Sequence, residues 1–285
     1  MSGRRREATT GRAVLRVNAD AAGGTSAQQR DDVLAVEEPL EIRVAGDTLC
    51  VTMRTPGQDR ELAVGFAHAE GVLQTIDDLG SVRHCGKAGT AEADNTIDML
   101  PAPGVHLDPD TAARSTLTTA ACGVCGRQTV DDLLRRCEPL AMAGAVPLST
   151  LVDGVAVLSQ RQPGFDATGA THAAVLIDEG GSVLAAAEDI GRHNAVDKVV
   201  GALLLSRRLE AARLLVVSGR VSFEIVQKAT VARIPLLVGV SAPTSLAVDL
   251  AQRMGITLAG FARGSTLNLY THRGRVRDME RESDR

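Results

Sequence analysis

The sequence predicts an α/β protein built as a layered sheet covered by helices, with a smaller α+β part at its N-terminal end. Two observations predict this class. In the second half of the chain, apolar runs of strand length alternate with amphipathic segments of helical length. That pattern is typical of a largely buried sheet packed against helices. The 285 residues are also 44% hydrophobic, enough to bury the core of one large domain or of two smaller ones.

The second half predicts its elements in a clear order. Residues 173–177 and 182–187 alternate like paired strands around a Glu-Gly-Gly turn. Ser222 is a candidate N-cap, and Gly255 follows the last predicted helix as a stop signal. Helices are predicted at 193–205, 222–232 and 245–254, strands at 213–217, 235–240 and 257–261, and extended chain at 267–271.

The first half begins with a polar segment. Residues 1–30 are rich in Arg, Thr, Gly, Ser and Gln and have little apolar periodicity, which predicts a disordered tail. A segment with two Pro and Gly144, residues 139–150, is the best candidate boundary between domains. We therefore expect an N-terminal subdomain at 31–140 and an α/β domain at 146–275. Within the subdomain, strands are predicted at 40–44, 49–53 and 96–100, and a helix at 61–73.

Composition argues against several classes of partner. The formal net charge is −4 and aromatic residues make up 2% of the chain, so a nucleic-acid surface is not expected. No apolar run has the length of a membrane span, and none follows Arg4 to Arg6 as in a secretory signal. The odd number of cysteines, five, favours a reducing compartment. We expect a cytoplasmic protein without membrane or nucleic-acid partners.

The chemistry predicted for this chain centres on a thiol pair, Cys122-Gly-Val-Cys125. Small residues flank both cysteines, and a segment of helical pattern follows them. A helix N-terminus and the nearby Arg127 would both stabilise a thiolate. The alternative is a tight turn whose two cysteines are buried. Cys50, Cys85 and Cys137 are scattered along the chain and are expected to be structural.

A zinc site is a second interpretation of the same cysteines. His68-Ala-Glu70 followed by Cys122 and Cys125 has the residue order of the zinc deaminase signature. Two details disfavour it: Ala121 rather than Pro precedes the first cysteine, and the two halves are far apart in sequence. A structural zinc site would need a second cysteine pair. No metal site is therefore predicted, although a zinc-dependent deaminase-like enzyme remains an alternative.

Four polar loops in the second half form a candidate binding site. They span 188–198, 218–224, 241–245 and 260–266, and the first three lie between a predicted strand and a predicted helix. Loops at one end of a sheet can form a single crevice. Arg192 and His193 would supply donors for an anionic group near a helix start. Neither a phosphate-binding GxxxxGK[ST] loop nor a strand-linked GxGxxG is present, which disfavours nucleotide hydrolysis and dinucleotide oxidoreduction.

Taken together, these segments resemble the formate dehydrogenase accessory sulfurtransferase (FdhD-like) family. The resemblance is carried by residues 118–126, 188–198, 218–228, 240–248 and 260–271, in register, and runs from about residue 35 to residue 272. It implies a cytidine deaminase-like α/β fold without catalytic zinc. It also implies a protein that takes sulfur from a cysteine desulfurase as a persulfide and passes it to a molybdenum or tungsten cofactor. That cofactor, bis-molybdopterin guanine dinucleotide, is then inserted into formate dehydrogenase.

The resemblance also implies roles for individual residues. Cys122 matches the persulfide-bearing position and Cys125 the assisting thiol. Guanine nucleotide binding and a homodimer are implied as well. The expected cofactor-binding residues are Phe261, Ala262, Arg263, Gly264, Ser265 and Thr266, joined by Arg192, His193, Arg220, Ser241 and Thr244 from the other loops. The chain departs from the family pattern at Ser265-Thr266, where a second Arg is expected, and at His68, where an apolar residue is expected. The competing function is a cofactor chaperone that carries no sulfur.

Overall fold

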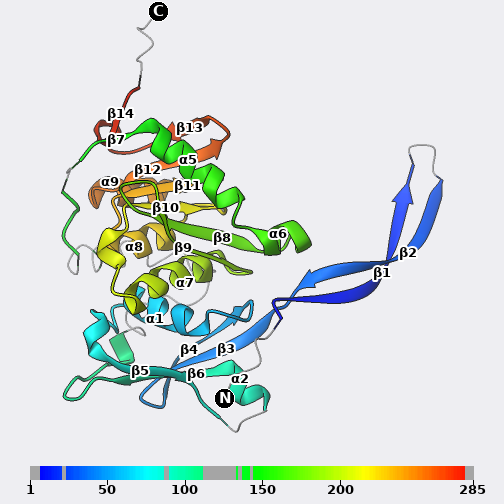
Figure 1. Ribbon diagram of the computed structural model, residues 1–285, viewed down its shortest axis with the longest axis horizontal. Coiled ribbons are helices and arrows are strands. Elements are labelled where there is room, and N and C mark those ends of the chain that lie inside the picture. Colours follow the sequence, from blue (N-terminus) through cyan, green and yellow to red (C-terminus); the bar gives the residue numbers. More distant parts are fainter. Residues whose placement is uncertain are drawn as a thin grey trace, which may run out of the picture.

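The computed structural model describes residues 7–20, 24–86, 90–111, 133, 137–141 and 144–279. This part of the chain has a mixed α/β fold with several sheets, as predicted (Figure 1). The candidate thiols Cys122 and Cys125 lie outside the described residues, as does most of the helical segment predicted after them. None of the described helices is long and apolar enough to cross a membrane.

A six-stranded sheet forms the centre of the second half, with the strand order β13-β12-β11-β10-β8-β9. Strands β10, β11 and β12 run parallel, whereas β8, β9 and β13 each pair antiparallel with their neighbours. The strands are β8 (His172–Ile177), β9 (Val183–Asp189), β10 (Leu214–Val217), β11 (Leu236–Gly239), β12 (Thr257–Arg263) and β13 (Thr266–Leu269). Every predicted strand of this half is therefore confirmed.

Helices cover both faces of this sheet (Figure 1). On one face lie α7 (Arg192–Leu205), α8 (Phe223–Val231) and α9 (Ser245–Arg253), and α5 (Leu148–Ser159) packs on the other. Side chains alternate accordingly: Leu215 belongs to the core beneath α7, whereas Leu214 and Val216 belong to the core beneath α5. Because both faces are buried, the strands consist of continuous apolar runs. A short helix, α6 (Pro163–Thr168), precedes β8.

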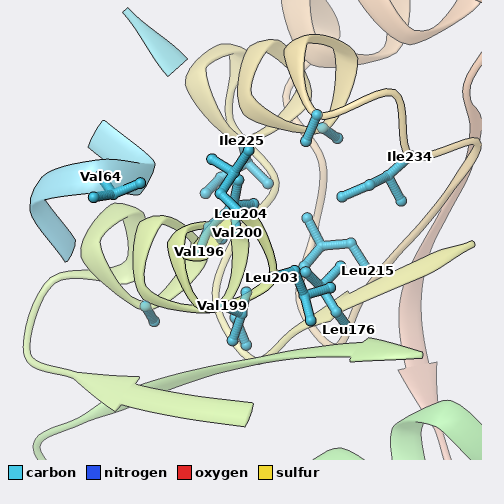
Figure 2. Packing of buried hydrophobic residues seen from close by; sticks show 14 of the residues in the cluster. Val64, Leu176, Val196, Val199, Val200, Leu203, Leu204, Leu215, Ile225 and Ile234 are labelled. Carbon is cyan, nitrogen blue, oxygen red and sulfur yellow. The ribbon is translucent and has the colours of Figure 1, made fainter. Parts of the chain in front are cut away.

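The N-terminal part packs against the helical layer. Its four-stranded sheet has the order β4-β3-β6-β5, with α1 (Asp59–Ala69) between this sheet and α7. Figure 2 shows Val64 of α1 on one side of α7, and Leu176 and Leu215 of the large sheet on the other. One hydrophobic core thus includes side chains from both predicted domains. The strands are β3 (Glu38–Val44), β4 (Asp47–Arg54), β5 (Leu79–His84) and β6 (Thr96–Pro101), and α2 (Ala91–Asn95) precedes β6.

The predicted disordered tail is wrong for most of its length. Strands β1 (Thr9–Ala19) and β2 (Thr25–Ala35) form an antiparallel ribbon that projects from the body (Figure 1). The ribbon exposes Leu15 and Val17, so a hydrophobic pattern based on burial could not reveal it. Its backbone pairing and the Asp20 carboxylate, which accepts a hydrogen bond from Gly24 N at 2.7 Å, hold it together instead.

The helix predicted at 61–73 ends earlier, at Ala69. Gly71 adopts a left-handed φ of 78°, and the N–H groups of Val72 and Leu73 both donate to Ala67 O. This C-terminal capping turn folds the two apolar side chains back into the core, so their periodicity resembles further helix. The remaining short elements are η1 (Ile76–Asp78), β7 (Val146–Pro147), η2 (Leu209–Ala211), η3 (Arg273–Arg275) and β14 (Val276–Arg277).

Candidate functional site

The four predicted polar loops meet at one edge of the six-stranded sheet. Parallel strands β10, β11 and β12 all end there, and so does β9, because β9 pairs antiparallel with β8 and β8 pairs antiparallel with β10. The loop that joins β12 to β13 lies at the same edge. The predicted clustering of these loops is therefore confirmed.

Backbone hydrogen bonds fix the neighbouring loops to one another. Val221 N donates to Ala242 O at 3.1 Å, and Thr244 N donates to Val221 O at 3.0 Å. Phe261 N in turn donates to Ser241 O at 3.1 Å. Thr244 is also the N-cap of α9, where its hydroxyl accepts from Ala247 N. Because these bonds link three successive loops, the relative positions of their side chains are set before any ligand binds.

His193 and Ser222 bring two of the loops into side-chain contact. His193 Nε2 lies 3.2 Å from Ser222 Oγ and 3.8 Å from Glu224 Oε2. Ser222 is the N-cap of α8, as predicted, but its side chain makes no capping hydrogen bond. Burial, with Lys228 and Arg192 adding to it, lowers the pKa of His193 from 6.5 to about 4. The ring is therefore neutral at physiological pH and can exchange a hydrogen bond with the hydroxyl in either direction.

A second histidine, His172, lies at this edge, although it was not predicted as a site residue. A Cβ added at Gly219 would lie 3.4 Å from both His172 Nδ1 and Arg192 Cβ, so the glycine sits between these two side chains. Burial and the charges of Arg192 and Arg220 lower the pKa of His172. His172 is the first residue of β8, and only the antiparallel pairing of β8 brings it beside the ends of other strands.

The segment 188–198 combines two roles. Arg192 and His193 belong to the loop edge, but Asp189 and Lys198 are buried and pair with each other at 2.7 Å. Lys198 Nζ also donates to Thr55 O at 3.0 Å, and Asp189 accepts from Thr55 N at 3.2 Å. Asn194 Nδ2 adds a hydrogen bond to Met53 O at 2.8 Å. Half of this polar segment therefore joins α7 to the N-terminal part and does not face a ligand.

A further buried ion pair lies deeper between the helices. Lys228 Nζ is 2.7 Å from Asp197 Oδ1 and 5.6 Å from the centre of the Phe66 ring. The nearby Cys50 has a pKa raised to about 12, mainly by burial and also by Asp197. A thiol in this environment stays protonated and is a poor nucleophile, which agrees with the structural role predicted for Cys50.

The predicted cofactor segment 261–266 has an unusual backbone. Phe261 adopts a left-handed φ of 52° at a bulge in β12, and its side chain is 46% exposed. Arg263 pairs with Thr266, whose hydroxyl donates to Arg263 O at 3.1 Å, and Gly264 between them has a φ of 53°. Ser265 is exposed at the tip. The Ala262 side chain, by contrast, is buried in the core beneath α5, so only its backbone could contact a ligand.

The proposed zinc ligands are not assembled among the described residues. His68 Nδ1 lies 3.0 Å from Leu73 O within the capping turn of α1. In the part of the chain that the structure describes, no three His, Cys, Asp or Glu side chains are placed to hold a metal ion. Since Cys122 and Cys125 are not among these residues, the thiol loop itself is not tested.

The neutral state of His193 predicts a pH effect on folding. Between about pH 6.5 and pH 4 the unfolded chain binds a proton on this side chain that the folded protein does not. The stability contributed by His193 is therefore complete above pH 6.5 and is lost as the pH falls through 4. We expect His193→Asn to flatten the pH dependence in this window, as measured by chemical denaturation. The matched control, His106→Asn at an exposed position, should keep the wild-type slope, and equal slopes in both variants would contradict the assignment.

Comparison with known proteins decides the family. A family model described as the FdhD/NarQ family matches residues 35–277. The chain belongs to the FdhD/NarQ family. Among similar family members, the sulfur carrier protein FdhD of Anaeromyxobacter dehalogenans is 49% identical over 255 residues, covering 86% of this chain and 88% of the relative. The sulfur carrier protein FdhD of Nocardia farcinica is 48% identical, covering 88% and 90% of the two chains.

The fold agrees with that of a solved structure. A crystal structure of a formate dehydrogenase accessory protein from Desulfotalea psychrophila matches with a TM-score of 0.72. The match covers 93% of this chain and 99% of the solved one, at 22% identity. The chain therefore shares its mixed α/β fold with this solved structure. The finer prediction of a cytidine deaminase-like fold stays a prediction.

Proposed function

We propose that this chain is a sulfur carrier in the maturation of formate dehydrogenase. It would take persulfide sulfur from a cysteine desulfurase onto Cys122 and deliver it to a molybdenum or tungsten bis-guanine-dinucleotide pterin held at the loop edge. The observation that carries the proposal is the assembly of four donor-rich loops at one edge of the sheet, in a member of a family whose relatives are named sulfur carriers. A cytoplasmic location and a homodimer belong to the same proposal.

The sulfur chemistry requires two thiols in succession. Cys122 as a thiolate attacks the terminal sulfur of the donor's persulfide. The donor's S–S bond breaks, its cysteine leaves as a thiolate, and Cys122 becomes the persulfide. Cys125 as a thiolate then attacks Cys122 Sγ and forms a disulfide, which supplies the two electrons that release the terminal sulfur as sulfide to the metal. A small thiol reductant restores both cysteines. Cys50 is unsuited to either step because its pKa is raised to about 12.

The residues of the loop edge suit a phosphate-rich substrate. Arg192 Nε is buried and, among the described residues, has no hydrogen-bond partner, which fits a site that an anionic group completes. Arg220, which follows β10, and Arg263, at the end of β12, are both exposed at the same edge. The bulge at Phe261 leaves an aromatic ring exposed beside Arg263, where a guanine or pterin ring could stack. Ser265 and Thr266 offer hydroxyls where the family pattern has a second arginine.

Intact-mass measurement tests the carrier role. The protein is incubated with a cysteine desulfurase and cysteine, and wild type is compared with Cys122→Ala and Cys125→Ala. We expect a sulfur adduct on wild type, its complete loss in Cys122→Ala, and its retention in Cys125→Ala with sulfur delivery blocked. Cys50→Ala is the matched control and should carry the adduct like wild type. Full sulfur delivery by Cys122→Ala would refute the assignment of the nucleophile.

A cofactor chaperone is the second candidate, favoured by one observation. The interlinked loops 218–224, 241–245 and 260–266 are built without either thiol, so the edge can bind a nucleotide in their absence. This function predicts guanine nucleotide binding that survives loss of both cysteines, together with no adduct on wild type. The zinc-dependent enzyme would instead purify with stoichiometric metal, which elemental analysis of the same protein measures.

A further inference from the structure

His172 and His193 form, with Arg192 and Arg220, a basic cluster that spans three elements of the loop edge. His172 begins β8, Arg192 and His193 begin α7, and Arg220 follows β10. Gly219 lies between His172 and Arg192, with a hypothetical Cβ 3.4 Å from each. Both histidines are partly buried, whereas Arg220 is exposed. We call these four residues the basic cluster.

Several charged side chains surround the two histidines. His193 is close to the cations Lys228 and Arg192 and to His172, with Glu224 as the nearby anion. His172 is close to Arg192 and Arg220, with Asp189 as the nearby anion. The Asp189 carboxylate already accepts from Gly191, Asn194 and Thr55 and pairs with Lys198. Lys228 is likewise paired, with Asp197 at 2.7 Å. Burial is therefore the first cause that disfavours a positive charge on either ring, and Arg192 adds to it for both.

We propose that both histidines are neutral when the basic cluster is empty and that they take up protons when a phosphate or diphosphate group of the substrate binds there. An anion close to the rings offsets the repulsion from the two arginines. Each proton taken up then tightens anion binding, since the coupling between proton and anion is reciprocal. This inference rests on the proposed function only for the identity of the substrate, because the binding site itself contains no thiol.

Sulfate is the probe of choice, because it is fully ionised over the whole pH range and does not itself release or take up protons. We expect wild type to bind sulfate about tenfold more tightly at about pH 5.5 than at about pH 8, measured at constant ionic strength. The double variant His172→Asn/His193→Asn should show less than about a twofold change, as for a site of arginines alone. The control His106→Asn, at an exposed position, should behave as wild type.

A second measurement needs no variant and so does not depend on how the variants fold. The chain has six histidines, few enough to follow individually by the NMR signals of their ring protons. Saturating sulfate should move the titration of two histidine signals to higher pH and leave the other four in place. The inference is overturned if sulfate binds with no pH dependence, if it does not bind at all, or if no histidine signal moves. A protein that binds sulfate as expected but carries no sulfur on Cys122 would refute the proposed function alone.

Discussion

Replacing Lys198 with Met should destabilise the protein by about 3–5 kcal/mol, since it leaves a buried carboxylate without its cation. Asp189 is fully buried, and Lys198 Nζ lies 2.7 Å from its Oδ2. The lysine also donates to Thr55 O and Glu188 O, so two backbone carbonyls lose a donor as well. Urea denaturation followed by circular dichroism measures the change in the free energy of unfolding.

A double variant separates the unpaired charge from lost packing. Lys198→Met/Asp189→Asn should be more stable than Lys198→Met alone, because a neutral amide costs less to bury than an unpaired carboxylate. The matched control is Asp77→Asn at the exposed pair of Asp77 with Arg207, where we expect no measurable change. A double variant less stable than Lys198→Met alone would show that the unpaired carboxylate is not the main cause of the destabilisation.

Gly201→Ala should also destabilise the protein, although alanine is the better helix former. A Cβ at position 201 of α7 would overlap Glu61 O of α1, and one at Gly65 of α1 would overlap Asp197 O of α7. The two helices therefore cross with their backbones in contact, and neither backbone can yield as a flexible side chain would. The helix propensity gained is about 1 kcal/mol, whereas overpacking costs about 1–3 kcal/mol or more. The steric overlap should therefore outweigh the gain in helix propensity.

Thermal unfolding of Gly201→Ala and Gly65→Ala measures this effect, and both melting temperatures should fall by several degrees. Gly11→Ala is the matched control, because no atom of the described residues lies within 4 Å of a Cβ at that position. We expect its melting temperature to stay within about a degree of wild type or to rise slightly, as the unfolded chain loses entropy. Unchanged melting of Gly201→Ala would mean that α1 and α7 can separate at little cost.

Apolar patterning predicted the large sheet because its strands are buried on both faces. Residues 214–217 form a run of four buried side chains, and such a run can be recognised in the sequence without knowing which strands pair with it. The ribbon at 9–35 and strand β5 were missed for the opposite reason. Most residues of the ribbon and half of those of β5 are exposed, so the pairing of these strands depends on backbone hydrogen bonds that leave little trace in composition.

The candidate site was predictable to the extent that it lies on strand-to-helix loops. Arg192, His193 and Arg220 each follow a strand end, where binding groups are expected in α/β folds. His172 begins its strand instead of following one, and the link from Lys198 to Thr55 spans 143 residues of sequence. Neither can be inferred locally, because each depends on how distant segments pair.

The reversed direction of β8 has a consequence for how the specificity of this edge can change. In a purely parallel sheet, every segment at this edge would follow a strand and lead into a helix. Altering such a segment shifts the start of the helix. The approach to β8 is different: Gly169 to Thr171 join α6 to the strand and lead into no further helix. Insertions or substitutions in this approach can reshape the surroundings of His172 while α7, α8 and α9 keep their positions. This segment, like the loop between β12 and β13, can therefore change without moving the start of a helix.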